Sequence, residues 1–465
     1  MKIGLVGSSY QQRSLPFDAQ RMINLFAISD PQGADVASLL GTPGLDLEVT
    51  AGSGPIRGGF AAANGRCFFL SGSELYEIDS SSVATLKGSV DTAGGIVTMA
   101  DNGFQLGICD GTSVYMFTYE TNVLVKVSDT DLPTSGAIDF IDGYFVVNEV
   151  DTGKFFISGL YDGTSWDPLD FATAESSPDK LIRAVNFVGQ LGLFGSGTLE
   201  IWRNTGDSDF PFSRISGSTP VGCIAPYTII SIDTSVYWVG HNSQGGGVVY
   251  RAQGFTPVRI STEAIEIILQ RETNPELLRS WTYQQEGHVF LVITGGNLET
   301  SLVYDLSTSL WHERAYLNSD GTYGQHRGSC CINIFNKFFV GDRVNGNIYS
   351  MSLDLFSDNG DAILRKRIYT HLIDELKDVR YSRLQIGFEA GVGLQSGQGS
   401  DPQMSLRVSR DGAKTWSNYY TASIGAVGKY LPQVTFRRLA ISQQCTFEIS
   451  ISDPVKVAIT GSYLS

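Results

Sequence analysis

The sequence is short of basic residues and of the spacings that mark metal or redox sites. It has 33 Lys and Arg against 48 Asp and Glu in 465 residues, a formal net charge of −15. This balance argues against a general nucleic-acid-binding surface, because affinity for phosphates comes mostly from Lys and Arg. The six cysteines include no Cys-x-x-Cys pair, so neither a zinc site nor a dithiol site is indicated. We expect the cysteines to be reduced and mostly buried.

Catalytic and targeting signatures are also missing. No Gly-x-Ser-x-Gly elbow, His-Glu-x-x-His pair or Gly-x-x-x-x-Gly-Lys loop occurs, and the five histidines are widely scattered. We therefore expect no catalytic residues, no cofactor and no metal. The first residues have too short an apolar run for a signal peptide, and no stretch of about twenty apolar residues predicts a membrane span. We expect no membrane insertion.

Glycine is abundant, with 52 residues, and it separates short apolar runs. The stretch 104–120 is typical: apolar residues alternate on both sides of Asp110-Gly111, which we expect to supply the positive-φ pair of a two-residue hairpin turn. Similar units begin at Arg66, Gly143, Gly189, Ser235, His288 and Asn336. Their spacing of roughly forty to fifty residues is the period of a propeller blade. We predict an all-β protein built on a β-propeller of six or seven blades.

The pattern divides the chain into three regions. We predict an extended N-terminal arm at 1–57, the β-propeller at 58–356 and a C-terminal β-sandwich-like domain at 357–465. The arm could add strands to its own sheet or to a neighbouring subunit. A short helical insertion is predicted at 261–270, with Thr262 as the candidate N-cap and Ile265, Ile268 and Leu269 as its apolar stripe. We favour a helix that covers the side of the propeller over one that projects toward another subunit.

Two patterns would suit a glycan-binding or glycan-cleaving propeller. The first is an aromatic residue at comparable positions of six units, and packing between blades, which we favour, requires the same repetition. The six residues are Tyr76, Tyr115, Trp202, Tyr250, Tyr304 and Tyr349. The second is Ser409 to Trp416, which resembles the Asp-box turn of sialidase-type propellers, itself a structural device. Likewise, we expect Asp305 and Asp342 to cap turns rather than to bind calcium.

Several short motifs occur in an order that is typical of one family. Arg13, Asp18 to Arg21, Asn24 to Phe26 and Gly41 to Gly44 resemble the N-terminal signature of the tail hub or nozzle proteins of short-tailed bacteriophages. These are also called packaged-DNA stabilisation proteins or tail accessory factors. The stretches 195–207, 221–228, 249–269, 302–313 and 340–349 are similar in order and spacing, so the resemblance covers most of the chain.

The resemblance implies a structural virion protein and no enzyme. It would be made and assembled in the host bacterial cytoplasm and would act in the virion tail as a ring, in that family a homohexamer. Its partners would be the portal adaptor, a tail spike or fibre, and a tail needle or plug. Double-stranded DNA would pass through its channel without sequence-specific binding and would be retained until ejection. A glycan-binding or glycan-cleaving propeller and a cytosolic scaffold propeller are the alternatives.

Candidate contacts for the ring and its adaptor lie outside the regular blades, in the arm, the helical insertion and the C-terminal domain. Four of them belong to two basic runs, which suit an inter-subunit contact or internal salt bridges. The candidates are Arg13, Asp18, Arg21, Asn24, Ile265, Ile268, Arg365, Arg367, Arg437 and Arg438.

Overall fold

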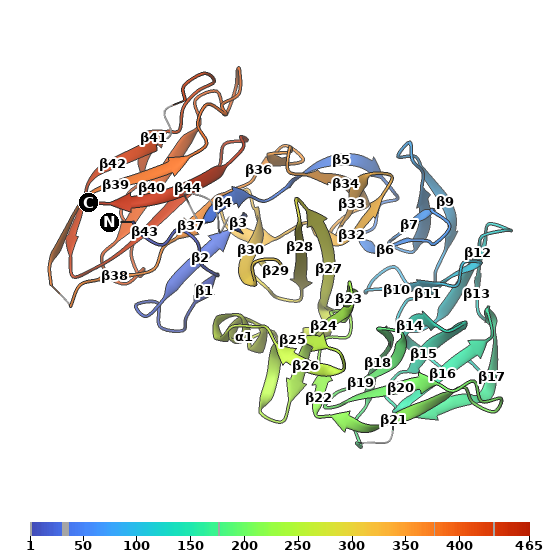
Figure 1. The fold of residues 1–465 in the computed structure, drawn as a ribbon. Helices are drawn as coiled ribbons and strands as arrows, with labels where there is room; N and C mark the ends of the chain where they lie inside the picture. The colour runs from blue at the N-terminus through green and yellow to red at the C-terminus, as the bar shows by residue number, and fades with distance from the viewer. Residues whose placement is uncertain (1, 30–36, 175–176, 376, 431–432) are drawn as a thin grey trace.

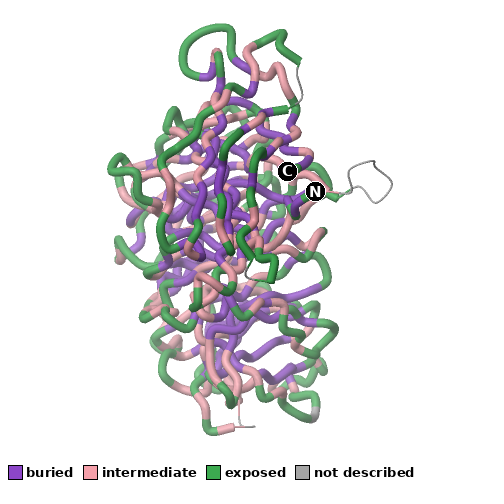
Figure 2. The backbone as a smooth tube through the Cα atoms, turned by 90° about the vertical axis from the view of Figure 1, so that its left-hand side faces the viewer, coloured by how far each residue is buried: buried purple, intermediate pink, exposed green. Residues whose placement is uncertain are grey.

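The computed structural model describes residues 2–29, 37–174, 177–375, 377–430 and 433–465. Figure 1 shows two bodies side by side: a ring of sheets and a β-sandwich that contains both chain ends. Buried residues run through the interior of both bodies, and the exposed ones concentrate in the loops (Figure 2). The all-β prediction is confirmed.

Seven antiparallel sheets follow one another around the ring in the described residues, and each contains a path of four strands. We call them the first to the seventh sheet. The first four are β6 (Ile56–Ala61), β7 (Cys67–Ser71), β8 (Glu74–Ile78) and β9 (Ala84–Ser89); β10 (Thr98–Asp101), β11 (Gln105–Cys109), β12 (Val114–Thr118) and β13 (Val123–Lys126); β14 (Ser135–Ile141), β15 (Tyr144–Glu149), β16 (Lys154–Gly159) and β17 (Asp162–Thr173); and β18 (Leu181–Phe187), β19 (Gln190–Gly195), β20 (Leu199–Asn204) and β21 (Phe212–Thr219).

The other three sheets complete the ring. They are β22 (Val221–Cys223), β23 (Ile230–Ile232), β24 (Ser235–Asn242), β25 (Gly245–Gln253) and β26 (Thr256–Arg259); β27 (Leu278–Gln285), β28 (His288–Gly295), β29 (Ser301–Asp305) and β30 (Leu310–Leu317); and β32 (Gly328–Ile334), β33 (Lys337–Asp342), β34 (Asn347–Ser352) and β5 (Gly44–Thr50). Each repeat unit found in the sequence corresponds to the two central strands of one sheet.

The turn predicted at Asp110-Gly111 differs in detail. Its hairpin, β11 with β12, forms as predicted, but only Gly111 has a positive φ, of 89°. The Asp110 side chain closes the turn instead, because its Oδ1 accepts hydrogen bonds from the backbone N–H of Thr112 (3.1 Å) and Ser113 (2.8 Å). The expected positive-φ pair is found at Asp142 (φ 51°) and Gly143 (φ 92°), in the next sheet.

An N-terminal strand closes the ring. β5 pairs with β34 as the outer strand of the seventh sheet, and β32 of that sheet contacts β6 of the first. An apolar cluster seals this junction, with Ile56 and Phe69 on one side and Phe339 and Ile348 on the other. Comparable clusters join every other pair of neighbouring sheets. Each sheet is therefore covered on both faces by its neighbours, which an isolated hairpin could not achieve.

The sandwich combines strands from both ends of the chain. One of its sheets has the order β3-β4-β44-β39-β42, and the other continues β2-β37-β43-β40-β41. Their bounds are β2 (Ala19–Ile23), β3 (Leu25–Ser29), β4 (Ala37–Gly41), β37 (Arg365–Ile368), β39 (Val379–Phe388), β40 (Gln403–Ser409), β41 (Tyr420–Ser423), β42 (Gln433–Ser442), β43 (Gln444–Ile451) and β44 (Ala458–Leu464). Two short strands accompany them, β1 (Tyr10–Gln11) beside β2 and β38 (Leu372–Ile373) beside β43. Three others extend sheets of the ring: β31 (Tyr323–Gln325) pairs with β30, and β35 (Ser357–Asp358) and β36 (Asp361–Ala362) follow β5.

The predicted N-terminal arm is therefore integrated into both bodies. β2 lies between β30 of the sixth sheet, which it pairs in parallel, and β37 of the sandwich, which it pairs antiparallel. Met22 and Leu25 are buried in the sandwich core. The sequence allowed the arm to pair with a sheet of its own chain or with a neighbouring subunit. β5 pairs within its own chain, as a strand of the seventh sheet.

The helical insertion forms where predicted, as α1 (Glu263–Gln270), followed by the one-turn helix η1 (Pro275–Leu277). Thr262 occupies the N-cap position without a capping side-chain hydrogen bond. Ile265 and Leu269 are buried between the fifth and sixth sheets. α1 thus covers the side of the ring, as favoured. Among the described residues, neither α1 nor any other helix has the length and apolar character to cross a membrane.

Candidate assembly surface

A groove lies between the N-terminal hairpin and α1, with a volume of about 380 Å³. We call it the arm–helix groove. It brings together four of the predicted contact residues, Arg13 and Arg21 from the arm and Ile265 and Ile268 from α1. Its remaining lining is Ser9, Gln11, Gln12, Leu15, Ala264, Ile267, Arg271, Glu299, Thr300 and Glu313.

A buried ion pair forms the floor of the groove. Arg21 Nε donates to Glu313 Oε1 at 3.0 Å, Nη2 donates to Oε2, and Thr300 Oγ1 also donates to Oε2 at 2.8 Å. Burial alone would raise the pKa of Glu313, but the charge and hydrogen bonds of Arg21 outweigh it and hold that pKa below its usual value. Glu313 lies on β30 and Arg21 on β2, so this pair fixes the arm to the sixth sheet.

The rim of the groove is available to another molecule. Arg13 and Arg271 are exposed, and Ile267 and Ile268 are half-buried. Phe17, in the same loop as Arg13, is 76% exposed. Apolar side chains flanked by arginines are typical of the surfaces that proteins use to contact one another.

Asp18 and Asn24 have internal roles instead. Asp18 Oδ1 accepts a hydrogen bond from the backbone N–H of Gln20 at 3.0 Å, at the start of β2. Asn24 is buried with a φ of 52°, and its side chain bonds both the N–H and the C=O of Ala315 and the C=O of Leu364. These hydrogen bonds hold the arm in place, and Asn24 is buried while Asp18 is half-buried.

Arg365 and Arg367 are buried, and Lys366 between them pairs with Glu448 at 3.5 Å, so this basic run takes the internal option of the two that the sequence left open. Arg367 is fully buried; its Nε donates to Leu5 O at 2.8 Å and its Nη2 to Gln20 Oε1 at 2.9 Å. Arg365 donates to Phe356 O at 3.3 Å. Both are hydrogen-bonded inside the chain, so we leave them out of the candidate surface.

Asp358, near Arg365, makes stability depend on pH. Burial raises the pKa of this carboxyl to about 6, against the opposing charges of Arg314 and Arg365. A folded-state pKa above the unfolded one contributes stability at low pH that is lost as pH rises through about 6. Between about pH 4 and pH 7.5, we expect the free energy of unfolding of the wild type to fall by about 3 kcal/mol relative to that of Asp358→Asn. Urea unfolding at each pH measures this difference. Parallel pH profiles of the two proteins would contradict this.

Arg437 and Arg438 are exposed on β42, as their predicted role requires. Arg438, with Arg380 and Arg410, lines a hollow of about 370 Å³ on the sandwich. Arg383, also exposed, is the cross-strand partner of Arg437. We call Arg380, Arg383, Arg410, Arg437 and Arg438 the sandwich arginine patch. It is a second candidate contact in a chain of net negative charge.

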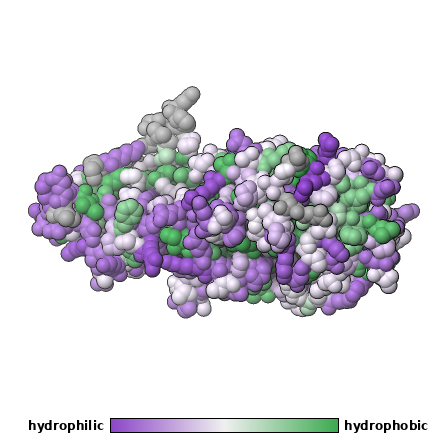
Figure 3. Space-filling view, turned by 90° about the horizontal axis from the view of Figure 1, so that it is seen from below, coloured by the Kyte–Doolittle hydropathy of each residue, from purple (hydrophilic) through white to green (hydrophobic). Residues whose placement is uncertain are grey.

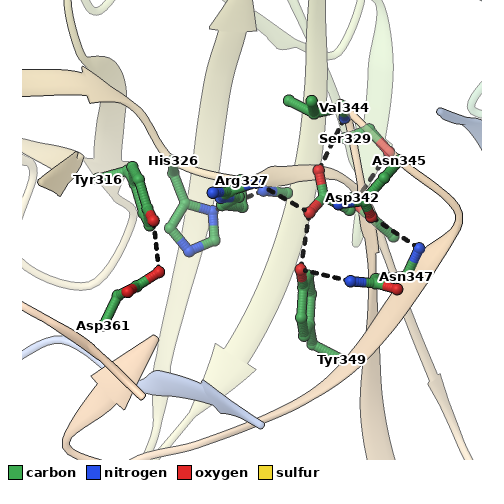
Figure 4. A network of polar contacts seen from close by, with 12 residues as sticks. Tyr316, His326, Arg327, Ser329, Asp342, Val344, Asn345, Asn347, Tyr349 and Asp361 are labelled. Atoms are coloured by element: carbon green, nitrogen blue, oxygen red, sulfur yellow. Dashed lines mark hydrogen bonds and ion pairs between the residues drawn. The ribbon is translucent and has the colours of Figure 1, made fainter. Parts of the chain in front are cut away.

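The residues that suggested other chemistry have structural roles. Asp342 Oδ1 accepts from the N–H of Val344 at 2.7 Å and its Oδ2 from the Tyr349 hydroxyl at 2.7 Å, within the network of Figure 4. Asp305 likewise accepts from the N–H of Ser307 at 2.9 Å. Both cap turns, as predicted. Across the part of the chain that the structure describes, no three His, Cys, Asp or Glu side chains gather in a group that could hold a metal ion.

The aromatic row packs between sheets. Tyr115, Trp202, Tyr250, Tyr304 and Tyr349 are between 2% and 9% exposed, within the clusters that join neighbouring sheets. Tyr76 is half-buried beside the cluster between the seventh and first sheets. The packing interpretation is confirmed. On the face of the molecule shown in Figure 3, apolar residues are scattered among hydrophilic ones.

The Asp-box turn is structural as well. Asp411 Oδ1 accepts from the N–H groups of Lys414 (3.1 Å) and Thr415 (2.9 Å), and hydrogen bonds led by that of the Thr415 hydroxyl lower its pKa to about 2. Gly412 has a φ of 75°, and a Cβ there would lie 2.8 Å from Pro16 Cα, so the turn packs closely against the N-terminal hairpin.

Comparison with protein families settles the family. Residues 1–355 match the family model described as Bacteriophage P22 Gp10, beta-propeller, and residues 366–465 match the one described as Bacteriophage P22 Gp10, beta-sandwich. The chain belongs to the bacteriophage P22 Gp10 family. Members of the P22 Gp10 family are structural proteins of the phage tail that stabilise packaged DNA, so this chain acts in the virion tail together with other virion components. The resemblance, the propeller with its sandwich and the prediction of a phage tail protein that stabilises packaged DNA are confirmed.

The other comparisons gave weaker similarities to this P22 Gp10 family member. No curated protein matched the chain. The WD40 beta propeller domain of Doa1 is 12% identical, with 66% of this chain and 96% of that chain covered and a TM-score of 0.41. The extracellular domain of the two-component system BT4673 from B. thetaiotaomicron is 10% identical, with 76% and 45% covered and a TM-score of 0.44. The chain therefore spans less than half the length of the BT4673 domain.

Proposed function

We propose that the chain assembles as a closed ring, a homohexamer, that continues the channel of the portal and its adaptor. The ring carries tail spikes or fibres on its outside, and with a needle or plug it retains the packaged DNA until ejection. Its role is mechanical and not enzymatic, and it is made in the host cytoplasm. The family membership and the arm–helix groove, where four predicted contact residues meet, support this proposal.

Closed rings of identical subunits need a head-to-tail contact between two different surfaces. The arm–helix groove is a candidate for one of these two surfaces, and the sandwich arginine patch lies on a different part of the chain. The groove offers half-buried Ile268 between exposed Arg13 and Arg271. We assign the groove to the contact with the neighbouring subunit and the patch to an acidic surface of the adaptor.

The net charge of −15 suits a DNA channel. A channel wall short of Lys and Arg lets phosphates slide past, whereas a basic wall would bind them and slow the exit of the DNA. A ring structure whose lumen is lined by Lys and Arg would contradict this account of the charge.

Charge reversal at the rim of the groove tests the ring contact. We expect the double variant Arg13→Glu/Arg271→Glu to fold with an unchanged melting temperature, because both side chains are exposed. Its incorporation into virions should fall at least about tenfold, because the loss of an arginine hot spot from an interface costs about 2 kcal/mol or more. Quantitative immunoblotting of purified particles measures this. Arg203→Glu, an exposed arginine on β20, is the matched control. Normal incorporation of the double variant would exclude the groove.

A further inference from the structure

A cavity of about 430 Å³ lies on the axis of the ring of sheets. All seven sheets contribute to its wall, through residues on or beside their innermost strands. A second cavity of about 240 Å³ shares Arg57, Ile96 and Arg279 with it. The volume of the larger cavity is typical of small-molecule sites. None of the residues predicted for assembly lines either cavity.

The walls carry an excess of positive charge. Arg57, Arg183 and Arg279 line the larger cavity, and Arg343 joins Arg57 and Arg279 in the smaller one. Among the described residues that line either cavity, Asp139 is the one acidic side chain. The walls of the two cavities together therefore carry four arginines and one carboxylate, in a chain whose net charge is −15.

Two of these arginines have hydrogen-bonding capacity to spare. Arg183 Nη1 donates to Pro226 O at 2.9 Å, but its Nε is buried without any partner. Arg279 Nη1 donates to Arg57 O at a long 3.3 Å. The Nε is enclosed by protein and does not face the cavity, so it is the outer guanidinium N–H groups of Arg183 and Arg279 that can donate charge-assisted hydrogen bonds to an anion there.

Arg57, in contrast, is held rigidly. Its guanidinium donates to the carbonyl oxygens of Gly95 (2.9 Å), Gly72 (3.0 Å) and Thr92 (2.6 Å) and to Thr92 Oγ1 (3.0 Å). All of these acceptors are neutral and fix the group, and nearby Asp110, which accepts from Thr92 Oγ1 at 2.8 Å, offsets part of its charge. Arg57 therefore supplies a fixed positive field at the cavity wall.

The surroundings of Asp139 and Arg279 favour the binding of an anion. Burial, and then the positive charges of Arg343 and Arg57, lower the pKa of Arg279. Burial raises the pKa of Asp139, although Arg183 and two backbone N–H groups oppose this effect. The single carboxylate is thus itself poorly solvated, and it does not balance four guanidinium groups.

We propose that the axial cavity binds a small oxyanion of the phosphate class, with Arg183 and Arg279 as its direct ligands and Arg57 and Arg343 as the surrounding positive field. The anion is either free inorganic phosphate or the terminal phosphate of a larger molecule. This site is separate from the assembly surfaces and does not depend on the proposed ring.

Titration calorimetry and thermal unfolding of the full-length protein test the proposal. We expect sodium phosphate to raise the melting temperature with increasing concentration, while sodium chloride of equal ionic strength does not. Arg279→Gln should weaken phosphate binding by at least about tenfold, because it removes a charged donor. Asp139→Asn should strengthen binding. Arg203→Gln, exposed on β20, is the control and should bind like the wild type.

Two further experiments distinguish free phosphate from the terminal phosphate of a larger molecule and check that the variants are folded. Tighter binding of ATP than of inorganic phosphate would assign the terminal phosphate of a larger molecule, and equal or weaker binding would assign the free ion. Arg183→Gln gives a second, independent test, and circular dichroism shows whether each variant is folded. Wild-type affinity in a folded Arg279→Gln protein, an equal shift with sodium chloride, or binding of citrate alone would overturn the proposal.

Discussion

Removal of residues 1–29 is expected to unfold the C-terminal sandwich. Five buried side chains of the sandwich core, Ile3, Leu5, Met22, Leu25 and Ala27, come from this segment. Each large apolar side chain contributes roughly 1.5–3 kcal/mol on burial, so the loss is on the order of 10 kcal/mol, as large as the whole stability of an ordinary domain. The deletion also removes β2, which pairs with both β30 and β37.

Limited proteolysis followed by mass spectrometry measures this outcome. We expect cleavage throughout 366–465 in the truncated chain, while 56–352 stays protected. The control keeps every strand and changes only the exposed loop, as Arg13→Ala/Phe17→Ala. A truncated chain whose sandwich resists protease like the wild type would contradict the prediction. Failure of this truncation to enter virions would report on folding and not on assembly, which is why we test assembly with exposed rim residues.

Arg367→Ala is expected to lower the free energy of unfolding by roughly 3–5 kcal/mol, because it removes a charged donor of several buried hydrogen bonds and leaves a cavity. The wild-type guanidinium bonds Leu5 O and Gln20 Oε1, with longer contacts of 3.5 Å to Gly7 O and Arg21 O. Alanine leaves these acceptors unpaired and opens a cavity between β2, β37 and the chain start.

Urea unfolding of Arg367→Ala and Arg437→Ala provides a matched comparison. Arg437 is an exposed arginine of the same sandwich, so its replacement should change stability by less than about 0.5 kcal/mol. Arg367→Met keeps the apolar stem and should recover part of the loss by filling the cavity. A change below about 1 kcal/mol in Arg367→Ala would show that the carbonyl oxygens find other donors.

Local patterns in the sequence predict the hairpins but not the strands that close the fold. Phe104 to Glu120 contains both strands of its hairpin, so alternation and a turn suffice to identify it. β5 pairs with β34, and β2 pairs with β30 and β37, all far away along the chain. The alternation of apolar and polar residues within 44–50 or 19–23 does not identify the strands with which these segments pair. The sequence therefore left open whether the arm pairs within its own chain or with a neighbouring subunit, and pairing with distant strands of the same chain decides this.

The charged residues illustrate the same limit. Arg365 and Arg437 belong to similar basic runs, yet one is buried and the other exposed. What separates them is a set of backbone carbonyl oxygens supplied by other segments, such as Phe356 O for Arg365. The axial arginines did leave a signal: Arg57, Arg183 and Arg279 recur on the innermost strands of three sheets. Aligning the repeat units on those strands would have revealed them.

The closure of the seventh sheet by β5 also sets an order in time. Roughly 300 residues are synthesised between β5 and its partner β34, which takes on the order of fifteen to sixty seconds on a ribosome that adds about 5–20 residues per second. During this interval β5 exists as an unpaired strand, with its hydrogen-bonding groups open to other chains. β5 is thus the first strand of the ring to be synthesised and among the last to pair.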